Sequence, residues 1–406
     1  MSGSGRAVLL KAGLLDGHLW WVMTLYLDNA ATTFPKPAGV REAMVQALEE
    51  LGGSPGRAGH RLAREASAAV FSCRVKVARL LGVSDPRRIV FTKNATEGIN
   101  IVLKGWLRPG DGVIISGMEH NAVVRPLRRL SLAGVQVRTV PCDPRGEIDL
   151  EALAEELSKV PRLMVLNHAS NVNGALQPLA SVLELCRAKG VPLLLDAAQT
   201  AGIQPLDLEA WGVGMMACSG HKALLGPPGV GILYIRPDLD VLPLMDGGTG
   251  SRSEEDAQPD FFPDRHESGT LNLPGIAGLA AGIDFITDRG VSELCRHEIE
   301  LARILEGGLE EMPGITVYKP GKRGTGAVSF NVAGMNPESV AHLLDELFQI
   351  AVRPGLHCAP LAHRTLMTFP EGTVRVSPGF SNSLEEMRSF LDSLGSLLSR
   401  RGQAPR

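Results

Sequence analysis

The chain has 406 residues, of which 44% are hydrophobic and 21% charged, and its formal net charge is −3. This composition is typical of a soluble globular protein, and the length favours two domains over one core. Lysine and arginine are scattered along the chain, which argues against a nucleic acid or an anionic membrane as partner. No apolar run reaches the roughly 18 residues that a membrane span needs.

The six cysteines show neither a CxxC pair nor a dense framework. In a chain of this length, such spacing predicts reduced thiols in a cytoplasmic protein rather than disulfides or a zinc site, and we expect no metal centre. Residues 1–22 are predicted to be a poorly ordered extension, because chain ends are usually loose unless something ties them down. A docked N-terminal arm is the alternative, and a signal peptide is disfavoured because no cleavage site follows an apolar core.

The middle of the chain alternates short apolar runs with amphipathic stretches, which predicts a parallel sheet covered on both sides by helices. The predicted strands are 89–92, 113–116, 135–138, 163–166, 193–196, 215–218 and 230–234, and the main helices are 38–51, 62–81, 95–106, 123–132 and 179–189. A polar segment, 247–263, is expected to be a surface loop. Residues 23–270 would form this large domain.

Residues 271–406 are predicted to form a connecting helix and a small C-terminal α/β domain. Helical periodicity covers 273–288, 292–311, 338–348 and 384–399, and short strands are expected at 325–332, 351–353 and 374–377. The predicted fold class is therefore α/β, with a mainly parallel seven-stranded sheet between helices and a second, smaller domain.

Polar residues follow several of the predicted strands. Ser219-Gly-His-Lys222 comes after the strand at 215–218, and Asp196 ends the strand at 193–196. A lysine in such a turn is more often a solvated surface charge, and the aspartate could be a helix cap. However, ligands of open α/β sheets bind at the carboxyl ends of strands, where an aspartate could pair with a protonated pyridine nitrogen.

Three further strand ends carry polar groups that would face the same crevice. Thr96 lies where a helix begins, which suits a phosphate, although capping chemistry gives the same pattern. His120 could stack on a flat ring or be a core histidine, and Asn171 could offer an amide to a ring hydroxyl. Together with Lys222 these groups predict one binding site.

These segments resemble the class V aminotransferase superfamily over about residues 26–398. The resemblance rests on Leu27-Asp-Asn-Ala-Ala-Thr-Thr, Asn94-Ala-Thr-Glu-Gly-Ile-Asn, Glu119-His-Asn, Asp196-Ala-Ala-Gln and Ser219-Gly-His-Lys. The tail, with Arg353-Pro-Gly-Leu-His-Cys358-Ala-Pro-Leu and Val374-Arg-Val-Ser-Pro-Gly-Phe, is similar to the cysteine desulfurase branch, in its short-loop second group.

The resemblance implies fold type I, a homodimer and pyridoxal 5′-phosphate (PLP) as cofactor. Lys222 would hold PLP as a Schiff base and move protons, and Cys358 would accept sulfur. The other implied cofactor contacts are Asp196 with the pyridine nitrogen, Gln199 with the ring oxygen, His120 stacked on the ring, Asn171 near the ring hydroxyl, Ala95, Thr96, Ser219 and His221 at the phosphate, and Thr270 from the second subunit. The implied substrate contacts are Arg375 as the carboxylate clamp, with Asn171, Arg353 and His60 nearby.

The implied activity is that of a cytoplasmic cysteine desulfurase, which converts L-cysteine to L-alanine and passes the sulfur through a persulfide on Cys358 to an acceptor protein, as in iron–sulfur cluster assembly. A lone cysteine is more often a small core residue. Here His357 and Arg353 flank Cys358 and could lower the pKa of its thiol. The other five cysteines are expected to be structural: Cys73, Cys142, Cys186, Cys218 and Cys295.

Alternatives from the same superfamily are a selenocysteine lyase, which would take L-selenocysteine, and a true aminotransferase. A catalytically silent PLP-binding scaffold is the alternative from another class. The segment 359–366 lacks the Met-rich pattern of the best-studied desulfurases, and 247–268 also differs from theirs. These departures leave open the acceptor and the choice between cysteine and selenocysteine.

Overall fold

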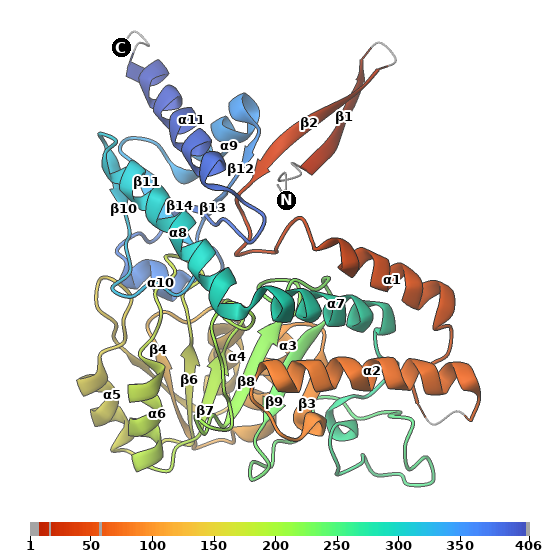
Figure 1. Cartoon of the computed structure of the whole chain (residues 1–406). Helices are drawn as coiled ribbons and strands as arrows, with labels where there is room; N and C mark the ends of the chain where they lie inside the picture. Colours follow the sequence, from red (N-terminus) through yellow and green to blue (C-terminus); the bar gives the residue numbers. More distant parts are fainter. Residues whose placement is uncertain (1–7, 16–17, 57–58, 403–406) are drawn as a thin grey trace.

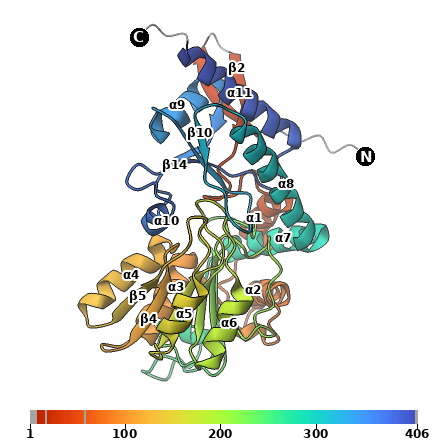
Figure 2. The same cartoon turned by 90° about the vertical axis from the view of Figure 1, so that its left-hand side faces the viewer.

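The protein structure, a computed structural model, describes residues 8–15, 18–56 and 59–402. A broad sheet flanked by helices forms the lower body in Figure 1, and a smaller α/β unit lies above it, as the side view in Figure 2 also shows. Within the described residues, no helix combines the length and the apolarity needed to cross a bilayer.

The large sheet has seven strands in the order β3-β9-β8-β7-β6-β4-β5. The strands are β3 (Ile89–Thr92), β4 (Gly112–Ser116), β5 (Gln136–Val140), β6 (Leu163–Asn167), β7 (Leu193–Asp196), β8 (Met215–Ser219) and β9 (Gly231–Ile235). Only β9 runs antiparallel to its neighbours, β3 and β8. The predicted mainly parallel, seven-stranded sheet is therefore confirmed.

Helices cover both faces of this sheet because alternate residues of each strand point to opposite sides. Ile114 of β4 packs with the core beneath α2 (Arg61–Leu80), α5 (Leu150–Leu157), α6 (Leu179–Ala188) and α7 (Leu273–Arg289). Its neighbours Val113 and Ile115 pack with the core beneath α3 (Ala95–Trp106) and α4 (Asn121–Leu132). The helix α1 (Ala38–Glu50) lies along α7.

The smaller unit has its own core around Phe330 and Phe390. Its antiparallel sheet has the order β10-β11-β14-β13 and consists of β10 (Ile315–Val317), β11 (Val328–Val332), β14 (Thr373–Val376) and β13 (Arg353–Gly355). Its helices are α8 (Val291–Glu310), α9 (Pro337–Phe348), α10 (Pro360–Thr365) and α11 (Leu384–Gly402). The predicted boundary at 270/271 falls just before α7, whose buried residues pack with the large core, whereas α8 contributes to the small one.

The polar segment 247–263 contains no helix or strand, as predicted, and ends at the short 3₁₀ helix η2 (Asp264–His266). Another 3₁₀ helix, η1 (Pro86–Arg88), leads into β3. These irregular stretches lie at the bottom of Figure 1, away from the junction of the two units.

The N-terminal region contains a feature that the sequence analysis did not predict. Val8–Leu15 (β1) and His18–Tyr26 (β2) pair as an antiparallel hairpin, so the expectation of an unordered extension over 1–22 does not describe these strands; residues 1–7 and 16–17 lie outside the described residues. The base of β2 pairs with the two-residue strand β12 (Ile350–Ala351) through Leu25 and Tyr26. The rest of the hairpin projects away from the body in Figure 1.

Deleting residues 1–22 tests how firmly this hairpin is docked. Because the paired contact with the body lies at Leu25 and Tyr26, which the truncated chain keeps, we expect the free energy of unfolding to change by less than about 1 kcal/mol. Denaturant unfolding of the chain starting at Met23, beside the full chain, measures this. A loss well above that value would show that the hairpin is an integral part of the fold.

Candidate active site

One pocket lies at the carboxyl ends of the central strands and gathers eight of the predicted site residues. Its lining includes Ala95, Thr96, His120, Asn171, Asp196, Gln199, Ser219 and Lys222. They follow β3, β4, β6, β7 and β8, whose carboxyl ends meet at one edge of the sheet. The site therefore forms where open α/β sheets usually bind ligands.

Lys222 and Asp196 form the electrostatic centre of this pocket. Burial lowers the pKa of Lys222 to about 8, and the nearby Asp196 carboxylate opposes this shift. Burial raises the pKa of Asp196, while the Ala198 N–H, 3.0 Å from Oδ1, and the Lys222 charge act in the opposite direction. The two groups thus stabilise each other's charge in a poorly solvated place.

His120 is the N-cap of α4, and this capping bond fixes its ring. Its Nδ1 accepts the Ala122 N–H at 3.0 Å, which leaves the proton of the neutral ring on Nε2. Burial, aided by the positive charge of Lys222, lowers the pKa of His120 to about 4. The ring is therefore neutral at physiological pH, with its orientation set by the helix.

The start of α3 provides hydrogen-bond donors at the opposite wall. Asn94 caps the helix through the Glu97 N–H, and the Ala95 N–H donates to the Ser219 hydroxyl at 3.0 Å. This bond joins the end of β8 to the positive end of α3 and brings Thr96 to the pocket. Such an end can bind an anion.

The segment after β2 lies over the turn that holds Lys222, and the sequence analysis assigned it no role. The Thr33 hydroxyl donates to the Lys222 carbonyl at 2.9 Å, and Lys36 Nζ donates to the His221 carbonyl at 2.6 Å. The Gln199 amide donates to the Ala30 carbonyl at 3.0 Å. The Leu27–Thr33 motif therefore holds the lysine turn in place.

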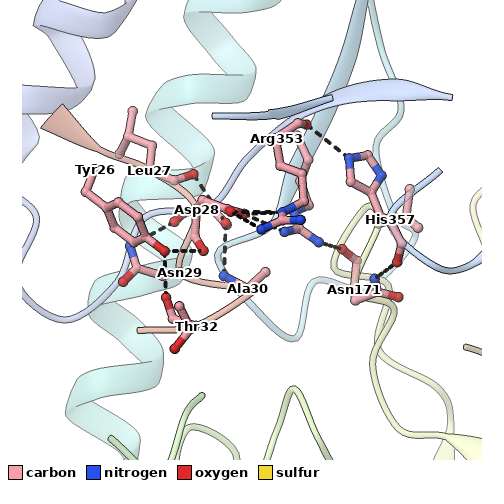
Figure 3. Close-up of polar contacts among 12 residues, drawn as sticks. Tyr26, Leu27, Asp28, Asn29, Ala30, Thr32, Asn171, Arg353 and His357 are labelled. Atoms are coloured by element: carbon pink, nitrogen blue, oxygen red, sulfur yellow. Dashed lines mark hydrogen bonds and ion pairs between the residues drawn. The ribbon is translucent and has the colours of Figure 1, made fainter. Parts of the chain in front are cut away.

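Asp28 connects two arginines from the smaller unit (Figure 3). One of its oxygens accepts from Arg375 Nη2 at 2.6 Å, and both accept from Arg353 Nε at 2.9 and 3.1 Å. Arg375 Nη1 donates to the Asn171 carbonyl at 2.9 Å, and its Nε is buried without a partner in the described chain. Arg375 is 2% exposed, so Asp28 neutralises a charge that water cannot reach.

Cys358 lies in a turn beside this cluster and is exposed. Its carbonyl accepts the Asn121 N–H at 2.8 Å, and the negative charge that its thiol can carry acts on the pKa values of both Lys222 and Arg353. His357 differs from the expectation of a thiolate-stabilising cation, since burial lowers the pKa of its ring well below 6.5. Lys222 and Arg353 are cationic groups whose pKa values the charge of this thiol raises.

Six predicted site residues do not line this pocket. Cys358, Arg353 and Arg375 belong to the neighbouring cluster described above, and the other three are His221, Thr270 and His60. His221 is partly buried, and its buried Nδ1 has no partner among the described residues. Thr270 is exposed on the wall of a separate cavity with Thr92 and Glu97. His60 is exposed and caps α2, with its Nδ1 accepting the Ala63 N–H.

The remaining cysteines lie in environments typical of structural residues. Cys73, Cys186 and Cys218 are buried, and Cys142 and Cys295 are partly buried. Burial raises the pKa of each of these thiols. Across the described part of the chain, no three His, Cys, Asp or Glu side chains come together in a way that could hold a metal ion.

Comparison with known proteins is consistent with this geometry. The profile of the class V aminotransferase family matches residues 25–390. A probable cysteine desulfurase of Methanothermobacter thermautotrophicus is 36% identical, with 91% of this chain and 94% of the relative aligned, and a cysteine desulfurase of Escherichia coli O157:H7 is 34% identical, with 82% and 84% aligned. The apo structure of a cysteine desulfurase from Thermococcus onnurineus superimposes with a TM-score of 0.86 at 33% identity, covering 93% of this chain and 95% of that one.

The chain therefore belongs to the class V aminotransferase family. Within it, these relatives identify the chain as an enzyme of the cysteine desulfurase branch. The family is one of PLP enzymes, and the sheet with its second antiparallel unit is the fold of those neighbours.

Replacing Asp28 by Asn tests the arginine cluster. The change keeps the side chain's shape but leaves the buried Arg375 without a counter-ion, so the free energy of unfolding should fall by about 3 kcal/mol. Asp284→Asn is the matched control, because it breaks the solvent-exposed pair with Lys76 and should cost less than about 1 kcal/mol. Equal losses in the two variants, measured by denaturant unfolding, would contradict the account.

Proposed function

We propose that this protein is a PLP-dependent cysteine desulfurase that converts L-cysteine to L-alanine and takes the sulfur on Cys358. The observation that carries the proposal is the placement of the exposed Cys358 within electrostatic reach of Lys222, the lysine of the pocket lining in the described chain. A lysine alone would fit any enzyme of the family. The thiol adds a second nucleophile, which sulfur removal needs.

The residues of the pocket fit PLP. The Lys222 amine would bind the aldehyde carbon of PLP, Asp196 would pair with the pyridine nitrogen, and the neutral His120 ring would cover one face. Asn171 lines the pocket, and its Oδ1 is buried without a hydrogen-bond partner in the described chain. A substituent of the PLP ring would supply the missing hydrogen bond. Ala95, Thr96 and Ser219 offer the start of α3 to the phosphate.

Gln199 and His221 would also contribute to PLP binding. The Gln199 amide already donates one hydrogen to Ala30, so its second hydrogen would reach the ring oxygen. His221 would contribute to the phosphate site through its turn, since its ring does not line the pocket.

The chain's own groups would bind the substrate and move its proton. When bound, PLP supplies an electron sink for negative charge at the substrate α-carbon. With a pKa near 8, Lys222 is neutral in part at physiological pH and can take a proton. Arg375 offers its free Nε to the substrate carboxylate, and the half-exposed Arg353 offers a second charge.

Cys358 would take the sulfur atom itself. Its thiolate would form a bond to the sulfur of the substrate cysteine while the carbon–sulfur bond breaks, which leaves a persulfide on Cys358. One proton would then reach the carbon that lost sulfur and another would return to the α-carbon, so that L-alanine leaves. Arg353, and Lys222 when it is protonated, place positive charge near the Cys358 sulfur. A selenocysteine lyase is the second candidate, because the same clamp would bind L-selenocysteine; an aminotransferase would have no use for the thiol.

We also propose a homodimer. Exposed apolar side chains on α1 and α2 support it: Val45 and Leu48 on α1, and Leu62 and Phe71 on α2. Thr270 is exposed beside a separate cavity, where it could reach the phosphate of a second subunit, and His60 caps α2 near this apolar surface. By analogy with the branch, we also propose that the protein is cytoplasmic, passes its sulfur to an acceptor protein and serves iron–sulfur cluster assembly.

The variant Lys222→Ala tests the cofactor assignment. The purified variant should lack the visible absorbance of lysine-bound PLP, because the described pocket lining offers no other lysine. Lys93→Ala, which removes an exposed lysine near the start of α3, should keep the wild-type spectrum. Borohydride reduction of wild type followed by peptide mapping should label Lys222, and a label on another lysine would refute the assignment.

The variant Cys358→Ser distinguishes a desulfurase from the other candidate functions of this site. The variant should keep bound PLP and should lose alanine formation from L-cysteine by at least about 100-fold, since a hydroxyl is a far weaker nucleophile toward sulfur. Cys295→Ser, which changes a partly buried cysteine on α8, should turn over normally. Wild-type alanine release from Cys358→Ser would contradict the proposed role.

A further inference from the structure

The turn that carries Cys358 has a backbone conformation that needs support. His357 and Cys358 are consecutive residues with left-handed φ angles of 48° and 55°. Such angles are costly for a residue other than glycine, and they persist only where the surroundings hold them. The thiol can therefore be aimed reliably only if other groups fix this turn.

One set of contacts comes from the large domain. The Asn171 amide donates to the His357 carbonyl at 2.8 Å, as Figure 3 shows, and the Asn121 N–H donates to the Cys358 carbonyl at 2.8 Å. These bonds hold the two carbonyl groups of the turn. They leave the side chain of His357 free to make contacts on the other side.

The second set is a chain of hydrogen bonds through two histidine rings. His357 Nε2 lies 3.0 Å from the Arg353 carbonyl, His357 Nδ1 lies 3.2 Å from His363 Nε2, and His363 Nδ1 lies 2.7 Å from the Thr368 hydroxyl. His363 is completely buried, and His357 and Thr368 nearly so. None of these side chains lines the cofactor pocket.

The Arg353 carbonyl determines which atoms donate and which accept in this series of hydrogen bonds. A carbonyl can only accept, so His357 Nε2 donates to Arg353, and Nδ1 of the neutral ring must accept. His363 then donates from Nε2, and its Nδ1 accepts from the Thr368 hydroxyl, which also lies 3.3 Å from the His363 carbonyl. Burial keeps both rings neutral by lowering the pKa of His357 and, to about 4, that of His363.

Both nitrogens of His357 are thus engaged, which leaves it no free lone pair with which to take the proton of the Cys358 thiol. We propose that His363 and Thr368 are positioning residues, which act through His357 to lock the Arg353–Cys358 turn and so aim the Cys358 thiol at the substrate. This inference rests on the proposed function, which assigns the sulfur to Cys358. It assigns roles to two side chains that do not line the cofactor pocket.

The pair Thr368→Val and Thr368→Ser tests the inference. Valine keeps the shape of threonine but removes the hydroxyl that ends this series of hydrogen bonds, whereas serine keeps the hydroxyl. In the holoenzyme, Thr368→Val should form the Cys358 persulfide at least about tenfold more slowly in a single turnover, because small misplacements of a reacting atom are costly. PLP content and the KM for L-cysteine should stay unchanged, and Thr368→Ser should regain most of the rate.

Hydrogen exchange gives a readout that does not depend on turnover. The backbone amides of residues 355–358 should exchange faster in Thr368→Val than in wild type and in Thr368→Ser. Thr287→Val removes a hydroxyl that bonds only within α7, so it should match wild type in both measurements. If wild type itself formed no persulfide, the proposed function would fail, and the exchange rates alone would then decide the positioning role.

Two results would overturn the inference. One is wild-type exchange and wild-type persulfide formation in Thr368→Val. The other is a parallel loss of PLP content and rise in KM, which would show that Thr368 supports the fold at large rather than the turn.

Discussion

The carboxylate of Asp28 between Arg353 and Arg375 is the interaction on which the site depends most. It joins the segment after β2 to β13 and β14, and Arg375 extends the link to the Asn171 loop of the large domain. Because Arg375 is buried, the small unit cannot keep this charge in place without Asp28. The proposed substrate clamp and the contact between the two units are therefore one electrostatic cluster.

Much of the pocket could be predicted from the sequence because parallel strands end at one edge of their sheet. Asp196, Ser219 and Lys222 each follow an apolar run that was recognisable as a buried strand, and the structure places them around one pocket. The seven strands were predictable for the same reason, since both faces of the central ones are buried. The strand β10 and the helix α10 are too short to show a period. The helix α5 was overlooked although Leu150, Leu153 and Leu157 have helical spacing.

The parts that were missed depend on contacts between distant segments. Asp28 lies in a motif that was noticed, but its partners follow 325 and 347 residues later, and no local pattern encodes such a pairing. His363 stands in the segment that departs from the better-known desulfurases, and that departure was the available signal. The hairpin had a local signal that was overlooked, since Asp16-Gly17 separates two apolar runs, a sequence typical of a tight turn.

The account as a whole requires that Cys358 is the residue that takes the substrate's sulfur. The most direct test is to treat the wild-type holoenzyme with L-cysteine, digest it without reductant and determine the mass of each cysteine-containing peptide. The account predicts about 32 Da added to the Cys358 peptide, one sulfur atom held by covalent catalysis, and no addition at the other five cysteines. Alanine release with the added sulfur on another cysteine, or with none on Cys358, would contradict it.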